Sequence, residues 1–514
     1  MAPWMLRHLL VWLAGILVVS ACGAARHGDD GGRPAIRVAV GSAPDSLDPR
    51  LATGAVGVRL SQLVAPPLCV VDDRLEPRLL LAQEIVQVDD RTVDVELRSG
   101  LAVGADDVVF TFASMLDPAL GSPHRGRLDV VAGVVVLDDR SVRFTLKGPH
   151  APFVVDVLCA SGIVRRADCG DSERCRTHPR GNGPFRRVDD GSQPDRLLLR
   201  REAEADGRPD LDVRIVRDGS ARLLSLLAGD LDVVMGDVQP WDVGPMQRAG
   251  LSVEATAGVG FSYLGINVRT EPLADSRVRR ALALAIDTKQ LVAGRLQGRG
   301  HRSSGVLPPG HWAKAAAVVP VDVDRDRARA LLREAEVAPG TTLRLLSSTD
   351  RLRQSSARAI ASQLEAIGLH VDVEVRDWSV VYERLKAGHF ELVLAKWTPV
   401  VEPDLLTTTV HSGRIPGPGV VAGGNRGAFV DVDVDGWLDE ARITTDVQAR
   451  ARLYGLVEAR LQEGVPFVPL WVDDEVIASG PRVRGPDGVS PLRPWRTGSF
   501  WPLVDAVVVD EGPR

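Results

Sequence analysis

The 514-residue chain is 45% hydrophobic and 25% charged, an ordinary globular composition with enough apolar material for large cores. At about 150 residues per domain, this length indicates two or three domains, and the composition excludes disordered, collagen-like, coiled-coil and polytopic membrane proteins. The 62 basic and 68 acidic residues leave a net charge of −6, which gives no electrostatic basis for binding nucleic acid.

The N-terminus has the features of an export signal. Arg7 precedes an apolar run over residues 9–19, which is too short to cross a bilayer as a stable helix, and two small residues then precede Cys22. This ending resembles the bacterial lipobox, in which the signal is cut before a cysteine that then carries diacylglycerol. We therefore expect a signal peptide over residues 1–21, a lipidated Cys22 and a polar tether over residues 22–33. An ordinary signal peptide cleaved elsewhere is the alternative.

Four cysteines remain after the signal, and export makes disulfides permissible. Cys169 and Cys175 are separated by five residues in a polar loop, where a local bridge would fix an otherwise polar segment. Their spacing fits no zinc pattern, so we expect no metal there. Cys69 and Cys159 either pair or are buried as small apolar residues.

Between residues 75 and 184 the pattern favours a small α+β subdomain. Alternating apolar residues predict short strands, pairs of aspartates mark turns between them, and one helix has an acidic start. The strands are expected over 92–97, 130–136 and 141–146, and the helix over 106–116.

Two later regions alternate strands with helices. The first has a strand over 211–217, a helix over 220–228 ended by Gly229, and a strand over 231–235. The second begins with a strand at Leu343 and continues with a helix over 352–367, a strand over 369–375, a helix over 379–386 and a strand over 390–394. Such alternation predicts parallel sheets with right-handed crossovers, and two separate regions predict two α/β lobes.

No sequence motif indicates an enzyme. The chain has no Walker loop, no HExxH, no GxSxG and no CxxC, and its ten histidines are dispersed. Gly258 and Gly260 form a lone glycine pair, which indicates a bend or a close backbone approach rather than a nucleotide site. We therefore expect no catalytic residues, no cofactor and no metal. In two-lobed α/β proteins the ligand usually lies in the interlobe cleft.

Eight short segments follow one another in the order typical of one protein family, over more than 400 residues. They are Asp45–Pro49, Leu97–Phe112, Gly181–Phe185, Leu227–Asp232, Tyr263–Asp287, Ala330–Ala335, Gln363–Gly368 and Val465–Trp471. Together they resemble the extracytoplasmic solute-binding proteins of family 5, the peptide and nickel importer class. Each segment alone is weak evidence, but eight in order are specific.

This resemblance implies a two-lobed periplasmic-binding-protein type II fold of the three-domain cluster C, with an α+β insertion in lobe one. The implied limits are 34–65, 184–266 and 479–514 for lobe one, 66–183 for the inserted subdomain and 267–478 for lobe two. The hinge would then lie where the chain crosses between the lobes, near Asn267 and Ser479.

The resemblance also implies a function. The cleft would close around a peptide or a related amine-bearing solute, and the closed protein would deliver it to an ABC permease driven by a separate ATPase. The protein would be a monomer at the extracytoplasmic face of the cell membrane, held there by its lipid, with no nucleic acid partner.

The resemblance suggests candidate ligand-binding residues in both lobes. Thr53 and Gly54 align with a cleft loop of the family, although they also suit an ordinary turn. With only three tyrosines in the chain, stacking surfaces would come from tryptophans or Tyr263. Trp397 is the first choice because its strand delivers it to a carboxyl end, where α/β clefts form. A core tryptophan is the alternative.

The segment after Trp397 departs from the family pattern. Peptide binders of this family carry an aspartate three residues after this tryptophan, where it pairs with the α-ammonium of the peptide. Here that position is Val400. Glu402 or Asp404 would substitute, or both cap the loop.

Two further hypotheses stay open, and the missing aspartate supports the first of them. A family member that has lost transport and serves as an envelope scaffold or regulator predicts a filled or apolar cleft. An exported hydrolase predicts a nucleophile beside a base, which spacing along the chain does not reveal.

Overall fold

The computed structural model describes residues 33–509, apart from 171, 190, 203–206, 237 and 418–422. The expected signal peptide and the expected lipidation site, Cys22, therefore lie outside the described residues. Within the part that is described, no helix is long and apolar enough to cross a membrane.

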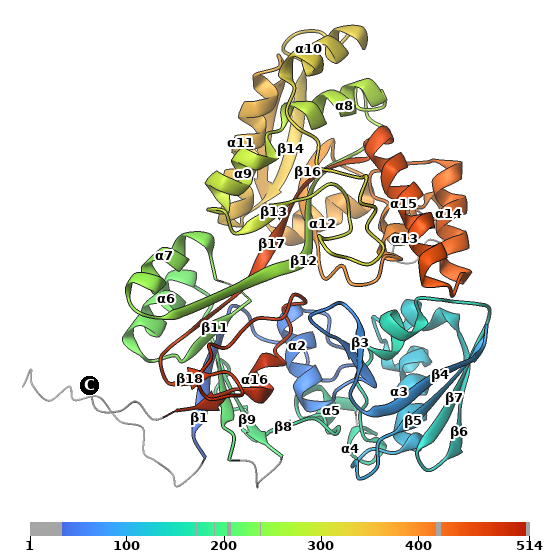
Figure 1. Cartoon of the computed structure of the whole chain (residues 1–514), viewed down its shortest axis with the longest axis vertical. Helices are drawn as coiled ribbons and strands as arrows, with labels where there is room; N and C mark the ends of the chain where they lie inside the picture. Colours follow the sequence, from blue (N-terminus) through green and yellow to red (C-terminus); the bar gives the residue numbers. More distant parts are fainter. Residues whose placement is uncertain are drawn as a thin grey trace, which may run out of the picture. The chain divides into compact units, whose positions relative to one another are not determined.

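One 11-stranded sheet organises the chain from Ala35 onward (Figure 1). Its order is β15-β14-β16-β12-β17-β11-β1-β10-β9-β8, and β13 pairs with β17. The strands are β1 (Ala35–Val40), β8 (Phe185–Arg187), β9 (Arg196–Arg201), β10 (Asp210–Ile215), β11 (Val233–Met235), β12 (Ser252–Ile266), β13 (Gly300–Arg302), β14 (Thr342–Ser348), β15 (His370–Arg376), β16 (Leu392–Trp397) and β17 (Phe467–Ser479). The part with β1 and β8–β11 corresponds to the expected lobe one, and the part with β13–β16 to lobe two.

The parallel pairings expected in both lobes are present. β1 runs parallel to β10 and β11, and β14 runs parallel to β15 and β16. The first β-α-β unit differs in one respect from the sequence expectation, because β1 lies between its two strands. The N-terminal strand therefore completes the centre of lobe one.

Local sequence sets the ends of the predicted helices. α6 (Gly219–Ala228) begins where the Asp218 side chain accepts a hydrogen bond from the amide of Ala221, and it ends at Gly229 with a φ of 78°. α11 (Arg351–Glu365) begins in the same way at Asp350, which accepts from the amide of Arg353. α12 (Trp378–Ala387) also agrees with the prediction to within a residue at each end.

The remaining helices cover the sheet or connect its strands. They are α2 (Ala55–Val64), α4 (Arg166–Cys169), α5 (Ser172–Thr177), α7 (Pro240–Arg248), α8 (Ser276–Ala285), α9 (Thr288–Arg295), α10 (Arg325–Glu334), α13 (Leu405–Val410), α14 (Val432–Ile443), α15 (Val447–Gly464) and α16 (Pro502–Asp505). Two small two-stranded sheets pair β2 (Cys69–Val71) with β3 (Pro77–Leu79) and β18 (Val483–Arg484) with β19 (Val507–Val508).

The inserted subdomain has the expected α+β character. β4 (Ala82–Asp89), β5 (Thr92–Leu97), β7 (Ser141–Leu146) and β6 (Val131–Asp138) form an antiparallel sheet in that order, covered by α3 (Ala105–Leu116). The Phe112 ring of α3 meets the edge of Phe144 with centroids 4.9 Å apart. Both possible disulfides are present, one joining Cys69 to Cys159 and the other Cys169 to Cys175.

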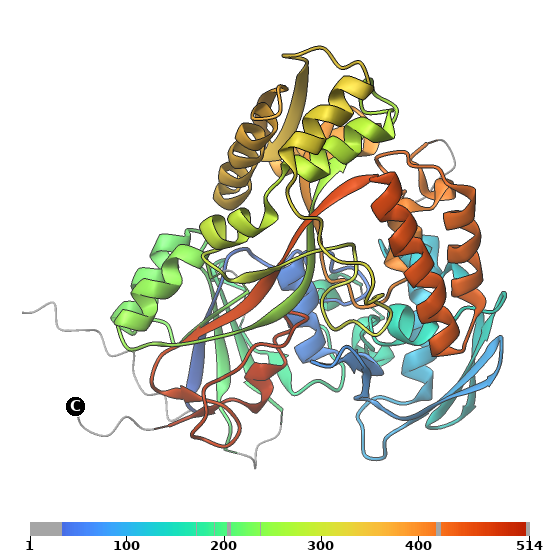
Figure 2. The same cartoon turned by 45° about the horizontal axis from the view of Figure 1, so that its top comes forward.

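Two long strands join the lobes. In Figure 1 and Figure 2, β12 and β17 run side by side from one lobe into the other. Residues 252–257 of β12 pair with 474–479 of β17, whereas residues 261–266 pair with β16 in lobe two. Their register shifts between Ala257 and Phe261. Residues 258–260 of β12 and 473 of β17 thus lie between the parts of these strands that pair with β11 in lobe one and with β16 in lobe two.

Gly258 shows why small residues occur at this crossing. A Cβ atom on Gly258 would lie 2.5 Å from the carbonyl oxygen of Asp473, and one on Gly260 would lie 2.3 Å from the Lys396 side chain. This is the close backbone approach that the glycine pair indicated.

The sheet of lobe two is covered on both faces. Because side chains alternate along a strand, Leu264 and Leu394 point into the core beneath α8, α9 and α11. On the opposite face, Tyr263 and Ala395 pack with α12. This alternation decides which residues reach each cavity.

Candidate functional site

A cavity of about 270 Å³ lies where β12 and β17 pass between the lobes. Gln239 and Pro240 of lobe one line it, together with the lobe-two residues Arg299, Asp350, Arg353 and Lys396 and the β17 residues Asp473, Asp474 and Glu475. We call it the interlobe cavity. An adjoining cavity of about 260 Å³ shares Gly236 with it and is lined by Arg59 of α2.

Three consecutive carboxylates of β17 face the interlobe cavity, and two of them have partners. Asp473 pairs with the Lys396 ammonium at 2.6 Å and accepts a hydrogen bond from the Trp471 indole at 2.7 Å. Asp474 lies 3.2 Å from the Nε2 atom of His301. The Glu475 side chain makes neither a hydrogen bond nor an ion pair within 4.0 Å with any described residue, although its backbone pairs with β12.

The Glu475 side chain is half-buried and has charges of both signs around it. Burial raises the pKa of this carboxyl group, the cations Arg59 and Lys396 oppose that shift, and the neighbouring Asp473 and Asp474 add to it. A half-buried carboxylate that has lost part of its hydration and has no protein partner is less stable than the same group in water. A cationic group of a ligand in the cavity would remove that cost.

Unpaired cations face the same space. Arg299 and Arg353 line the interlobe cavity and Arg59 lines the adjoining one, and the guanidinium group of none of the three has a carboxylate within 4.0 Å in the described part of the chain. The Arg353 guanidinium donates a hydrogen bond to the Ser348 hydroxyl at 3.2 Å, and no other acceptor for it lies in the described part of the chain. Guanidinium groups bind carboxylates through two parallel hydrogen bonds, so these residues can hold an anionic group.

One contact bridges the lobes at the rim of the interlobe cavity. The Arg351 guanidinium of α11 lies over the Trp241 ring of α7, 5.0 Å from its centroid. Both residues adjoin cavity-lining positions, Asp350 and Pro240. This cation–π contact therefore joins the lobes beside the cavity.

Thr53 and Gly54 form a turn in the structure. The amides of both residues and the Thr53 hydroxyl donate hydrogen bonds to one carboxylate oxygen of Asp45, over 2.6 to 2.9 Å. Both residues are exposed, and Ala55, which follows them, lines the adjoining cavity. Thr53 and Gly54 thus lie beside the cavities, but their amides and the Thr53 hydroxyl already donate hydrogen bonds within the turn.

Tyr263 and Trp397 line a different cavity, of about 40 Å³. Trp397 pairs with Phe261 across β12 and β16, and Lys396 pairs with Ser262, so the two pairs lie on opposite faces of the sheet. Lys396 and Ser262 reach the interlobe cavity, whereas Trp397 reaches the second one. The strand does deliver Trp397 to its carboxyl end, but on the face away from the interlobe cavity.

Glu402 and Asp404 are buried in ion pairs. Glu402 pairs with Arg450, and Asp404 accepts from the Thr407 hydroxyl at 2.7 Å and lies 3.3 Å from Arg442. Burial raises the pKa of Glu402 to about 7, against the opposing attraction of Arg450. Neither carboxylate lines the cavities above, and the Asp404 side chain makes no capping hydrogen bond with α13, so the geometry favours ion pairs within the protein over contact with a ligand.

Sequence reasoning missed the β17 residues. A run of three acids, Asp473 to Glu475, interrupts an otherwise apolar strand, and this was the available signal. A partly buried strand rarely carries three charges unless they have a role.

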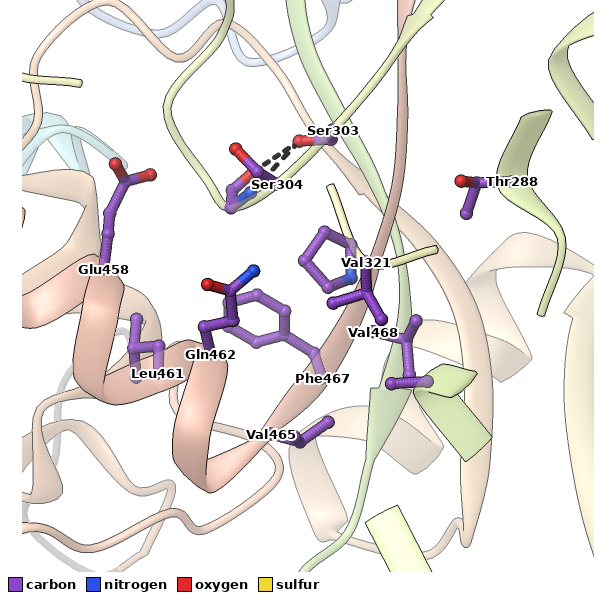
Figure 3. Close-up of a pocket in the computed structure, with 13 residues that line it drawn as sticks. Thr288, Ser303, Ser304, Val321, Glu458, Leu461, Gln462, Val465, Phe467 and Val468 are labelled. Carbon is purple, nitrogen blue, oxygen red and sulfur yellow. Dashed lines mark hydrogen bonds between the residues drawn. The ribbon is translucent and has the colours of Figure 1, made fainter. Parts of the chain in front are cut away.

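A further pocket lies within lobe two, beneath α15 (Figure 3). Leu461, Val465, Phe467 and Val468 form its apolar wall. Its volume of about 30 Å³ suits a water molecule rather than a solute. The interlobe cavity is therefore the better candidate for a ligand.

Comparison with known proteins settles the family. Residues 75–414 match the family described as "Bacterial extracellular solute-binding proteins, family 5 Middle". The chain belongs to this family. Its members are transport binding proteins rather than enzymes, which sets the hydrolase hypothesis aside.

Curated relatives agree over most of their length. Di/tripeptide-binding protein 2 of Pseudomonas aeruginosa is 30% identical over 396 residues, covering 71% of this chain and 73% of that protein. The dipeptide-binding protein of Escherichia coli is 25% identical over 426 residues, covering 74% of this chain and 78% of that protein.

Solved structures share the two-lobed α/β fold. The oligopeptide-binding protein AppA of Bacillus subtilis, solved with a nonapeptide, has a TM-score of 0.77 at 19% identity. The substrate-binding protein CtaP of Listeria monocytogenes has a TM-score of 0.81 at 21% identity. Each comparison covers 93% of this chain and 100% of the other.

Proposed function

We propose that the protein binds a short peptide in the interlobe cavity and delivers it to an ABC permease with a separate ATPase. Glu475 holds the α-ammonium group of the peptide, and Arg353 with Arg299 holds its carboxylate. The observation that carries this proposal is the presence of unpaired charges of both signs around one cavity.

A zwitterionic ligand fits these charges better than a ligand of one sign. Glu475 is kept without a partner in a half-buried position, and its neutralisation by an ammonium group would contribute directly to binding. The arginines would be paired at the same time. Relatives named for binding dipeptides, tripeptides and oligopeptides support a peptide as the ligand.

The closing motion belongs to the same proposal. β12 and β17 are the strands that join the lobe sheets, and their register shift near residues 258–260 is the natural hinge. Placing the lobe limits there, rather than near residues 267 and 479, puts the ligand-binding carboxylate Glu475 next to the hinge. A ligand that contacts both lobes then stabilises the closed form.

We also propose that Cys22 carries the lipid anchor and that the exported protein acts as a monomer at the outer face of the membrane. The basis for the anchor is the lipobox-like sequence alone. The scaffold hypothesis predicted a filled or apolar cleft, whereas the interlobe cavity is charged, so transport is the better supported function.

Calorimetric titration of the purified protein with trialanine tests the proposal. We expect Glu475→Gln to weaken binding by about 2–4 kcal/mol, because it removes one partner of a charge pair. N-acetylation of the peptide should cost a similar amount. The control Glu84→Gln changes an exposed carboxylate of the inserted subdomain and should leave binding unchanged.

Two results would contradict this proposal in different ways. Equal affinity of wild type and Glu475→Gln would discard the role of that carboxylate. No binding of dipeptides, tripeptides or longer peptides by the wild type would discard the peptide as ligand.

A further inference from the structure

Aromatic and arginine side chains form a continuous series of contacts along one edge of lobe two. From the interlobe cavity, the Arg353 guanidinium lies 5.1 Å from the Trp378 ring centroid, and the Trp378 and Tyr382 rings are 6.2 Å apart. The Arg426 guanidinium then lies 4.9 Å from the Tyr382 ring and 5.1 Å from the Trp397 ring. We call these five residues the aromatic series.

The topology explains why these residues meet. Arg353, Trp378 and Trp397 lie at or just beyond the carboxyl ends of β14, β15 and β16, which are neighbouring parallel strands. Carboxyl ends of parallel strands lie at one edge of the sheet, where α/β proteins bind ligands. From Arg353 at the interlobe cavity, the series passes to Trp378 and Tyr382 of α12 and then, through Arg426, to Trp397, whose cavity lies on the opposite face of the sheet.

The series is accessible to a ligand. Trp378 is 40% exposed and Tyr382 is 38% exposed, although both are large aromatic residues. Exposed aromatic faces of this kind suit a peptide backbone or an apolar side chain.

Arg426 is the residue that gives this surface its chemical preference. In the described part of the chain no carboxylate lies within 4.0 Å of it, and its Nε atom is buried without a hydrogen-bond partner. Neighbouring cations differ, because Arg384 pairs with Glu374 and Lys386 pairs with Glu383, both within 2.8 Å. A guanidinium group held between two aromatic faces keeps its edge free to donate to a carboxylate.

We infer that the peptide extends out of the interlobe cavity across Trp378 and Tyr382, and that Arg426 binds a carboxylate group of its distal part. This inference rests on the proposed function and names its substrate class: peptides longer than a dipeptide that carry an acidic group at the distal position. The group is either an acidic side chain or the C-terminal carboxylate of a peptide of matching length.

A peptide series separates these two sources. The probes are alanine tetra-, penta- and hexapeptides with one glutamate at each position beyond the second, together with matched glutamine peptides and C-terminal amides. The wild type should bind one glutamate peptide about tenfold more tightly than its glutamine partner if the side chain is bound. If instead the C-terminus is bound, amidation of the peptide of one length should lower the affinity of the wild type for it about tenfold.

Variants test whether Arg426 causes the preference for a peptide with a distal carboxylate. Arg426→Gln should abolish the tenfold preference and leave trialanine affinity unchanged, whereas Arg426→Lys should retain part of it through the charge. Arg333→Gln, which changes an exposed arginine on α10, is the matched control and should keep the full preference. Trp378→Ala should weaken the binding of pentapeptides several-fold more than the binding of dialanine.

The outcomes distinguish this inference from the proposed function. Equal affinities across all glutamate, glutamine and amide partners, or an undiminished preference in Arg426→Gln, would overturn the role of Arg426 while peptide binding stands. If the wild type binds no peptide at all, the proposed function fails and the extension fails with it.

Discussion

Two acidic segments of this chain have opposite surroundings. Glu402 and Asp404, on the loop after β16, are buried and paired with Arg450 and Arg442. Glu475, on β17, is half-buried and has no partner in the described part of the chain. The first segment completes its electrostatic interactions within the protein, whereas the second leaves one interaction for a ligand.

The paired segment should therefore affect the stability of the fold, whereas the unpaired carboxylate should affect ligand binding. Breaking a buried ion pair leaves one charge uncompensated and costs stability, although the pair itself need not stabilise the fold. An unpaired carboxylate at a cavity costs the empty protein free energy that a cationic ligand recovers. Substitutions in the two segments should therefore change different quantities.

The largest effect should come from the buried segment. Arg450→Gln leaves Glu402, Asp404 and the neighbouring buried Asp156 without that cation, and we expect a loss of about 3–5 kcal/mol in the free energy of unfolding at neutral pH. Urea denaturation measures this loss. Trialanine affinity of the folded variant should be unchanged.

The pH dependence of that loss has a definite sign. Arg450 opposes the raised pKa of Glu402, so its removal raises that pKa further in the folded state only. The folded variant then binds a proton that the unfolded chain releases, and its stability falls as pH rises above about 4.5, the ordinary value for glutamate. Wild-type Glu402 itself has a pKa of about 7, so the part of the deficit that this carboxyl causes should shrink as pH falls below about 7 and grow above it. Arg452→Gln, an exposed neighbour on α15, should show no such loss.

A smaller effect should appear in the pH dependence of peptide affinity. Glu475 must be ionised to hold an ammonium group, and burial raises its pKa above the ordinary glutamate value. Affinity for trialanine should thus fall as pH decreases, by up to tenfold per unit below that pKa, at a higher pH than for an exposed glutamate. Titration calorimetry between pH 4 and 8 measures it.

Other groups around this carboxylate also titrate, and one variant separates them. Asp473 and Asp474 lie beside Glu475, and His301 lies against Asp474. In Glu475→Gln the remaining pH dependence belongs to these neighbours, so the acid-side loss should become shallower. An identical pH profile in the variant would show that Glu475 does not carry the charge to which the peptide responds.

The sequence predicted the lobes because local rules determine them. Period-two strands, aspartate N-caps and glycine ends located β10, α6, β14, α11 and α12 to within a few residues. The position of the crossing was not predictable in this way, since it depends on which strand pairs with each half of β12. The position of β1 was not predictable either. It lies between β10 and β11, although these two strands follow each other in the chain with only α6 between them.

The ligand-binding residues were harder to predict than the fold. Trp397 was placed at the right end of its strand, but a shift of one residue along a strand exchanges the two faces, and Lys396 faces the interlobe cavity instead. Glu402 and Glu475 are chemically identical in the sequence. Only the tertiary structure shows that the first meets Arg450 and that the second meets no partner.

The smallest effect should come from the contact that joins the lobes at the cavity rim. Arg351 stacks on Trp241 at an exposed position, where a cation–π contact contributes about 0.5–1 kcal/mol. Because this contact forms between the lobes, Arg351→Gln should destabilise the closed form and raise the dissociation rate of bound peptide about two- to fivefold. The association rate should change little, since peptide enters before the lobes meet. Stopped-flow displacement of a fluorescent peptide measures both rates.

A matched variant on the same helix shows whether the ring contact is responsible. Arg358→Gln removes an equally charged, exposed residue of α11 that makes no contact with Trp241, and it should release peptide at the wild-type rate. Trp241→Leu should reproduce the faster release of Arg351→Gln, and the double variant should be no faster than either single one. Additive rate increases in the double variant would mean that the two residues act separately, and the contact would then have no part in holding the lobes together.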